Sequence, residues 1–153
     1  MSAQIEDGMG PLTEGQLAQA ESTLGIVLAD DYRAFMLEHN GGRPEPDGFA
    51  IAWRSGQKAA AAGASSMVSW FFSIHDGRHE NLLRMNQITF VGRLPKGTIA
   101  IGRDPGSNLL LLRCDDSPQR GEVLYWLMEM ESRGDNLGLV ATSFDEFLHV
   151  KLR

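Results

Sequence analysis

Apolar residues recur with a helical period in two segments of the first forty residues. In the first segment, Leu17, Ala20 and Leu24 share one face of a helix. Thr13 and Gln16 have the spacing of a capping box, in which each side chain bonds the other residue's backbone N–H. We therefore expect the first helix to begin at about residue 13 and to end before Gly25.

A second helix is predicted from about residue 30, where Asp30 or Asp31 could cap its first turn. Four residues at i, i+3, i+4 and i+7 form its buried stripe: Tyr32, Phe35, Met36 and His39. The Asn-Gly-Gly sequence at residues 40–42 ends this helix, because these residue types tolerate a positive φ. His39 is expected to be a hydrogen-bonded core histidine.

The period changes to two after residue 48, which is typical of strands. Residues 49–53 alternate large and small side chains, and residues 67–75 form the most strand-like stretch of the chain. Residues 54–66 are rich in Ala, Gly and Ser and are expected to form a loop, in which residues 58–62 could make a helical turn. A short helix is expected at residues 79–86.

Three more strands are predicted at residues 98–101, 108–114 and 122–128. Their connections contain Asp, Pro, Gly and Ser and are too short for a crossover. The three strands are therefore expected to be antiparallel neighbours, in sequential order. Ser143 and Glu146 form a second capping box, which opens a C-terminal helix.

These elements predict an α+β fold in one domain over residues 12–153. Its mainly antiparallel meander is flanked by N-terminal helices and a C-terminal helix. Residues 1–11 lack periodicity and are expected to form a flexible N-terminal tail, and residues 131–138 are expected to form a polar loop.

Composition places the chain among globular proteins of the cytoplasm. Of its 153 residues, 42% are hydrophobic and 22% are charged. Cys114 is the single cysteine, which rules out an intramolecular disulfide and favours a reducing compartment. The N-terminus is acidic and unlike a signal peptide, and no apolar run has the length of a membrane-spanning helix.

The net charge of −6 is concentrated near the N-terminus. Residues 1–32 contain six carboxylates and no Lys or Arg, whereas residues 33–153 contain 14 acidic and 14 basic residues. This distribution argues against binding to nucleic acid or to an anionic membrane. An acidic patch could steer a basic protein partner, although carboxylates at helix N-termini would also explain the pattern.

The sequence contains no motif typical of catalysis and no convincing metal-binding motif. The chain contains no nucleophile elbow, no Walker loop and no zincin motif. His75 and His79 are spaced i, i+4, but Gly77 interrupts the helix that would make them metal ligands. Cys114 ends an apolar strand and is expected to be a buried thiol. We expect no catalytic residues, no cofactor and no metal.

Five short motifs follow one another along the chain. They are residues 24–42, which end in Asn-Gly-Gly, residues 93–104, residues 106–110, Gly121-Glu122-Val123-Leu124-Tyr125-Trp126, and Ser143-Phe144-Asp145-Glu146-Phe147-Leu148. In this order they resemble the SUKH superfamily of Smi/Knr-type proteins, over about residues 12–152. Ala29 departs from the pattern, since the family usually has proline before the aromatic helix.

The resemblance implies a non-enzymatic, protein-binding role. Bacterial proteins of this type are immunity proteins that bind and neutralise a cognate polymorphic toxin, often a nuclease or a deaminase, and fungal relatives are regulatory interaction proteins. Partner contacts are expected from Glu21, Asn40, Gly41, Gly42, Glu45, Asp47 and Trp53. The alternative is a small cytosolic hydrolase or ligand-binding enzyme with a cleft near residues 40–47.

Overall fold

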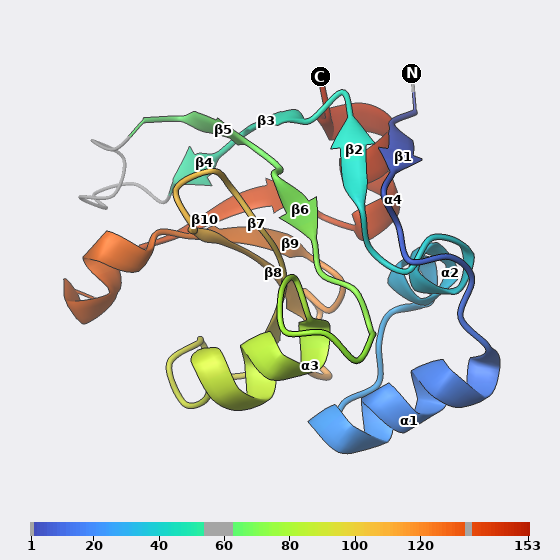
Figure 1. Ribbon diagram of the computed structural model, residues 1–153. Helices are drawn as coiled ribbons and strands as arrows, with labels where there is room; N and C mark the ends of the chain where they lie inside the picture. Colours follow the sequence, from blue (N-terminus) through green and yellow to red (C-terminus); the bar gives the residue numbers. More distant parts are fainter. Residues whose placement is uncertain (1, 54–62, 134–135) are drawn as a thin grey trace.

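The computed structural model describes residues 2–53, 63–133 and 136–153 (Figure 1). The helices are α1 (Glu14–Leu24), α2 (Asp30–Glu38), α3 (Leu82–Arg84) with a π-helical continuation at Met85–Thr89, a 3₁₀ helix at Met128–Arg133, and α4 (Phe144–Glu146) with a π-helical continuation at Phe147–Lys151. The strands are β1 (Gln4–Glu6), β2 (Arg43–Glu45), β3 (Gly48–Ala50), β4 (Ala52–Trp53), β5 (Ser65–Met67), β6 (Trp70–Phe71), β7 (Thr98–Arg103), β8 (Leu109–Arg113), β9 (Val123–Trp126) and β10 (Leu137–Ala141).

A six-stranded antiparallel sheet forms the centre of the protein, in the order β4-β10-β9-β8-β7-β6. Strands β7, β8 and β9 are sequential neighbours, which confirms the predicted meander and the α+β class. All four leucines at residues 109–112 are fully buried. Since successive side chains of a strand point to opposite faces, both faces of the sheet are covered at β8.

The N-terminal segment is more ordered than its composition indicates. Strand β1 pairs antiparallel with β2, with Ile5 opposite Pro44. The backbone N–H of Ala3 also donates to the carbonyl of Leu148, at 3.1 Å. Residues 4–6 therefore form a paired strand within the segment for which the sequence predicts a flexible tail. A three-residue polar strand has no detectable period, and its partner strand lies far along the sequence.

The two strands predicted at residues 49–53 and 67–75 are each interrupted in the structure. Residues 49–53 belong to β3, which pairs with β5, and to β4, which pairs with β10. The predicted strand at residues 67–75 is likewise divided between β5 and β6. The N–H of Val68 bonds to Asp47, and the N–H of Ser69 bonds to Arg103. The chain thus changes pairing partner between adjacent residues, which no sequence period records. The helical turn considered at residues 58–62 lies outside the described residues.

Strand β10 was not predicted, because its Gly138 indicates a loop when the sequence is considered alone. In the fold, β10 lies between β9 and β4. A Cβ atom on Gly138 would lie 2.4 Å from Cγ2 of Ile51 and 3.0 Å from the ring of Trp53. The glycine therefore permits the close approach of β4, and residues 137–138 are part of the sheet.

The helix caps agree with the predictions at α1 and differ at α2. Thr13 and Gln16 form both bonds of the capping box of α1, and Gly25 ends that helix with a φ of 69°. Helix α2 begins after Ala29, which makes no side-chain cap, so neither predicted aspartate caps it. Asp31 lies inside the first turn of α2. Its Oδ1 accepts a hydrogen bond from the N–H of Tyr32 at 2.8 Å, and its Oδ2 accepts one from the N–H of Asp145, in the first turn of α4, at 3.0 Å.

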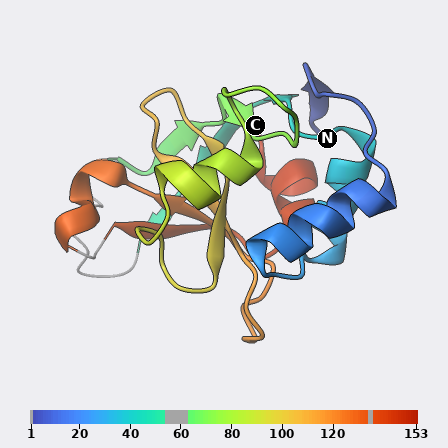
Figure 2. The same cartoon turned by 60° about the horizontal axis from the view of Figure 1, so that its bottom comes forward.

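Aromatic side chains join the helices to the sheet. Phe35 of α2 lies 5.3 Å from Phe71 of β6 and 4.9 Å from Phe144 of α4, measured between ring centroids. Phe147 contacts Phe71 from the other end of the cluster, at 6.0 Å. Helices α1 and α2 and the C-terminal helix therefore lie together on one side of the protein, opposite the 3₁₀ helix (Figures 1 and 2).

Candidate functional site

The Asn-Gly-Gly sequence after α2 makes contacts inside the protein. The side-chain amide of Asn40 donates to the carbonyl of Ile74 at 2.9 Å and accepts from the same residue's N–H at 2.7 Å. Gly42 exchanges two backbone hydrogen bonds with Phe71. All three residues of the sequence are buried. Their contacts join the end of α2 to the sheet and set the position of β2.

The chain that follows these residues borders a groove of about 540 Å³ between β2 and β6. We call it the acidic groove. Its lining is Glu6, Arg43, Pro44, Glu45, Asp47, Met67, Val68, Ser69, Trp70, His79, Glu80 and Arg103. Two of the predicted contact residues, Glu45 and Asp47, thus lie in one surface depression. It occupies the place that the alternative hypothesis gave to an enzyme cleft.

The two arginines of the acidic groove are already engaged. Arg103 makes a two-pronged ion pair with Glu80, with N–O distances of 2.7 and 3.0 Å. The Arg43 guanidinium lies 5.5 Å from the centroid of the Trp70 ring and 3.4 Å from Asp7. Arg43 and Trp70 are close enough for a cation–π contact. These contacts hold the cationic groups against the walls of the groove.

Carboxylates outnumber cationic groups in the acidic groove. Four acidic side chains line it, against two arginines. Among the described residues, no ion pair is recorded for Glu6, Glu45 or Asp47. The groove therefore carries a negative potential that attracts basic side chains. Ser69 and His79 also line it, but within the described part of the chain no hydrogen bond joins these two residues.

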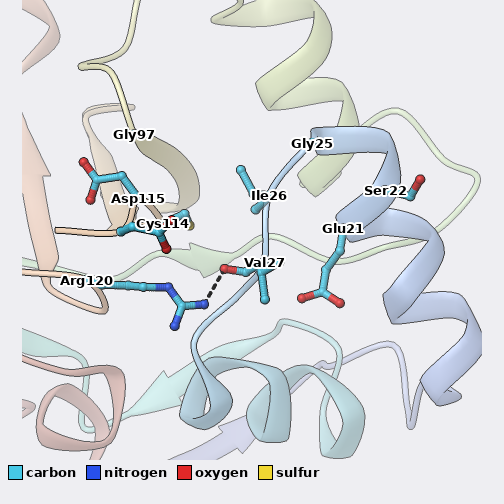
Figure 3. A pocket seen from close by; sticks show the side chains of 10 residues that line it. Glu21, Ser22, Gly25, Ile26, Val27, Gly97, Cys114, Asp115 and Arg120 are labelled. Carbon is cyan, nitrogen blue, oxygen red and sulfur yellow. Dashed lines mark hydrogen bonds between the residues drawn. The ribbon is translucent and has the colours of Figure 1, made fainter.

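The structure separates the other two predicted contact residues from this groove. Glu21 accepts a hydrogen bond from the N–H of Leu28 at 2.8 Å and pairs with Arg33 at 3.2 Å, so it connects α1 to α2. It borders a different hollow, at the end of α1 (Figure 3). The indole N–H of Trp53 donates to the carbonyl of Gly63 at 2.6 Å, at the edge of the sheet.

Trp70 is the aromatic residue of the acidic groove, and it belongs to the stretch of residues 67–75 that the sequence predicts as a strand. The period of two in this stretch puts Trp70 on the same strand face as Val68 and Phe72, which favours the core for all three. In the structure Trp70 is half-buried, whereas Val68 and Phe72 are buried. Polar residues on both sides of the predicted strand could have indicated that Trp70 is partly exposed. Such residues are common next to strands, so they are weak evidence of exposure.

Arginines beyond residue 32 partly neutralise the acidic N-terminal segment. Arg33 pairs with Glu14 at 3.1 Å as well as with Glu21, and Arg43 pairs with Asp7. Three of the six carboxylates of residues 1–32 are therefore paired with arginines from later in the chain. Contacts between segments that are distant in sequence, such as β1 with β2, bring the opposite charges together.

The remaining candidate groups have structural contacts. His75 closes a turn: its Nδ1 accepts from the N–H of Gly77, and its Nε2 lies 2.9 Å from the carbonyl of His79. Within residues 2–53, 63–133 and 136–153, no group of three or more potential ligands could hold a metal ion. Burial raises the pKa of the Cys114 thiol to about 12, which keeps it protonated and weakly nucleophilic.

The antiparallel sheet, the helices packed against it and the acidic groove beside it define a small α+β domain with a negatively charged surface groove. The chain belongs to the SMI1 / KNR4 family (SUKH-1), which matches residues 11–149. The resemblance found in the sequence motifs is thereby confirmed. Ala29, the departure from the family's proline, has a φ of −62°, which proline also adopts, and α2 begins directly after it.

A protein of Bacillus subtilis (strain 168), described as the SPbeta prophage-derived uncharacterized protein YokK, is similar to this chain. The two are 23% identical over 145 residues, which cover 89% of this chain and 72% of the relative. Among the described residues, no helix combines the length and the hydrophobicity needed to cross a membrane.

Proposed function

We propose that this protein is a non-enzymatic immunity protein that binds a bacterial toxin domain and blocks its activity. Membership of the SMI1 / KNR4 family (SUKH-1) supports a protein partner in general. The similar protein YokK is described as prophage-derived, which fits a role in competition among bacteria and their mobile elements.

The acidic groove is the observation that carries this proposal. The carboxylates of Glu45 and Asp47 make no recorded ion pair within the described residues, so they can accept basic side chains of a partner. Trp70 and Met67 add partly exposed apolar surface next to them, and Met67 is 47% exposed. Tryptophan is among the residue types enriched in the contacts that dominate the energy of protein binding. We therefore assign the partner contact to this groove instead of to Glu21 and Trp53.

The test uses the protein encoded by the reading frame next to that of this chain. Its association rate with the immunity protein is measured between about 50 and about 500 mM salt, because charge steering is screened at high ionic strength. The double variant Glu45→Gln with Asp47→Asn should associate about tenfold more slowly than wild type at low salt. At high salt, the two rates should converge.

The matched control is Asp30→Asn with Glu129→Gln, which removes the same charge from two exposed carboxylates outside the acidic groove. It should associate at nearly the wild-type rate. Equal slowing in both double variants would show that only the net charge matters, and it would contradict the groove assignment. A neighbouring protein that is toxic when expressed alone, and that this chain fails to neutralise, would contradict the immunity role itself.

A further inference from the structure

Arg43 places a guanidinium of the chain itself on the aromatic ring of the acidic groove. Its Cζ atom lies 5.5 Å from the centroid of the Trp70 ring, within the range of a cation–π contact. Strand β2, which begins with Arg43, lies beside β6, which begins with Trp70 (Figure 1). One face of the ring is therefore covered by a cation from within the chain.

The contacts that hold Arg43 on this ring are weak ones. Its guanidinium lies 3.4 Å from the Asp7 carboxylate, and both side chains of this ion pair are 56% exposed. Ion pairs and cation–π contacts at exposed sites contribute little to stability, because water competes for the charged groups. Arg43 can therefore leave the ring of Trp70 at a small cost in free energy.

Arg103, the second arginine of the acidic groove, is held more firmly. It lies opposite Trp70 in the pairing of β6 with β7. Two of its N–H groups donate to Glu80 at 2.7 and 3.0 Å. The side chains of Arg103 and Glu80 are 32% and 19% exposed, less than that of Arg43. A two-pronged contact that is less exposed is the stronger one, so Arg43 is the cation that a partner can displace.

A displaced Arg43 would still have carboxylates beside it. It lies directly opposite Glu6 in the pairing of β1 with β2, and side chains at directly opposite positions are neighbours on one face. Among the described residues, no ion pair is recorded for Glu6. Glu6 and Asp7 can therefore neutralise the guanidinium of Arg43 after it leaves Trp70, which lowers the cost of the exchange.

The place that Arg43 leaves is better suited to another guanidinium than to an ammonium group. Glu45 and Asp47 line the same groove as Trp70. A guanidinium is planar, so it stacks on an indole ring while its five N–H donors remain available to carboxylates. An ammonium group is compact and more strongly hydrated, so it gains less from the ring. The groove therefore favours arginine over lysine.

We propose that Arg43 is an internal competitor of the acidic groove, and that an arginine of the partner displaces it from Trp70. The incoming guanidinium stacks on the ring and bonds to Glu45 or Asp47. This inference rests on the proposed function and defines the partner more narrowly, as a protein that presents an arginine on the surface entering the groove.

The test titrates the full chain with a blocked tripeptide that has arginine between two glycines, and NMR follows the amide signals of Glu45 and Asp47. The indole N–H signal of Trp70 should shift with them, whereas that of Trp126, which is buried, should stay in place and show that the protein is folded. The matching lysine peptide should bind about fivefold more weakly. The uncharged citrulline peptide should leave all signals unchanged.

Removal of the competitor should strengthen binding. Arg43→Gln should bind the arginine peptide about fivefold more tightly than wild type, because the ring is then free. The lost charge by itself could also strengthen binding, so the substitution is repeated in a Trp70→Leu background. There it should lose most of its effect, since the ring that Arg43 covers is absent. The matched control Arg84→Gln removes the charge of an exposed arginine outside the groove and should bind like wild type.

A gain that persists in the Trp70→Leu background would show that Arg43 acts through its charge alone, and it would overturn the proposal. Equal affinity for the lysine and arginine peptides would overturn it too, as would shifts centred away from Glu45 and Asp47. No toxin takes part in this titration, so its result is separate from the test of the immunity role. If the chain neutralises a toxin but does not bind the arginine peptide, the proposed function stands and this inference fails.

Discussion

Asp104 shows how this protein accommodates a buried carboxylate. Its Oδ1 accepts hydrogen bonds from the N–H groups of Gly106 and Asn108, at 2.9 Å each. Its Oδ2 accepts from the hydroxyls of Ser66 and Tyr125 and from the side-chain amide of Asn108. The side chain is only 4% exposed. Five donors replace the water that the carboxylate loses on folding, and they connect the β7–β8 turn to β5 and β9.

Tyr32 is the opposite case, because its buried hydroxyl lacks a partner among the described residues. Its ring is fully buried, 5.1 Å from the ring of Phe144. Burial, followed by the nearby Cys114, raises the pKa of this phenol. The ring stabilises the core, but its hydroxyl carries a desolvation cost with no compensating bond.

Removing the hydroxyl from each tyrosine should therefore have opposite effects on stability. Tyr32→Phe should raise the free energy of unfolding by about 1 kcal/mol, because an unpaired buried group is removed. Tyr125→Phe should lower it by about 1.5–3 kcal/mol, because a hydrogen bond to a carboxylate is lost. Urea denaturation of the two variants and wild type measures both changes. A loss of stability in Tyr32→Phe would show that this hydroxyl has a partner in solution.

At the scale of elements, the end of α2 is the joint on which the groove region depends. Gly41 has a φ of 80°, in the left-handed region. A Cβ atom there would lie 2.3 Å from the Ser73 hydroxyl and 2.7 Å from the carbonyl of Phe71. Gly25, after α1, has a similar φ of 69°, but nothing lies within 4 Å of such an atom. Both glycines therefore have a left-handed backbone, but of the two only Gly41 also has neighbouring atoms too close to admit a Cβ atom.

Alanine substitutions at these two glycines should separate the two effects. Gly25→Ala should cost about 1 kcal/mol of stability, which is the usual penalty of a left-handed residue with a Cβ. Gly41→Ala should cost more than about 3 kcal/mol, since it adds collisions with the backbone of β6. Thermal and urea unfolding of both variants measures the difference. Equal losses would mean that the α2–β6 joint relaxes to accept a side chain.

At the scale of the whole molecule, Cys114 reports on the integrity of the core. It is 8% exposed, and burial raises the pKa of its thiol from 9.0 to about 12. The folded state thus keeps a proton that the unfolded chain releases. Its contribution to stability is complete below about pH 9 and is lost as pH rises toward 12.

The thiol should consequently be about a thousandfold less ionised in the folded protein than in the unfolded chain near pH 8. Alkylation by iodoacetamide, followed by mass spectrometry, should be slow in buffer and fast in urea. The rate in buffer should increase in destabilised variants such as Gly41→Ala, because modification then requires opening of the core. Rapid alkylation of the wild-type protein in buffer would show that the thiol is accessible without unfolding.

Several features of this protein follow from local sequence. The capping box at Thr13 and the Asn-Gly-Gly helix end depend on residues that are neighbours in the chain, and both are present in the structure. The β7–β8–β9 meander depends on short connections, which leave adjacent antiparallel pairing as the available topology. The family was also readable, because its motifs are short and occur in a fixed order.

Other features depend on contacts between distant segments, which only the tertiary structure decides. Pairing partners set the extent of β1 and β10 and the break between β5 and β6, and the hydrophobic period does not encode those partners. The charge balance changes when Arg33 and Arg43 meet the acidic segment, and Trp70 becomes a groove residue only when β2 lies beside β6. Local sequence determined the helix ends, the β7–β8–β9 meander and the family, whereas the short strands and the surfaces available to a partner arise from how distant segments pack.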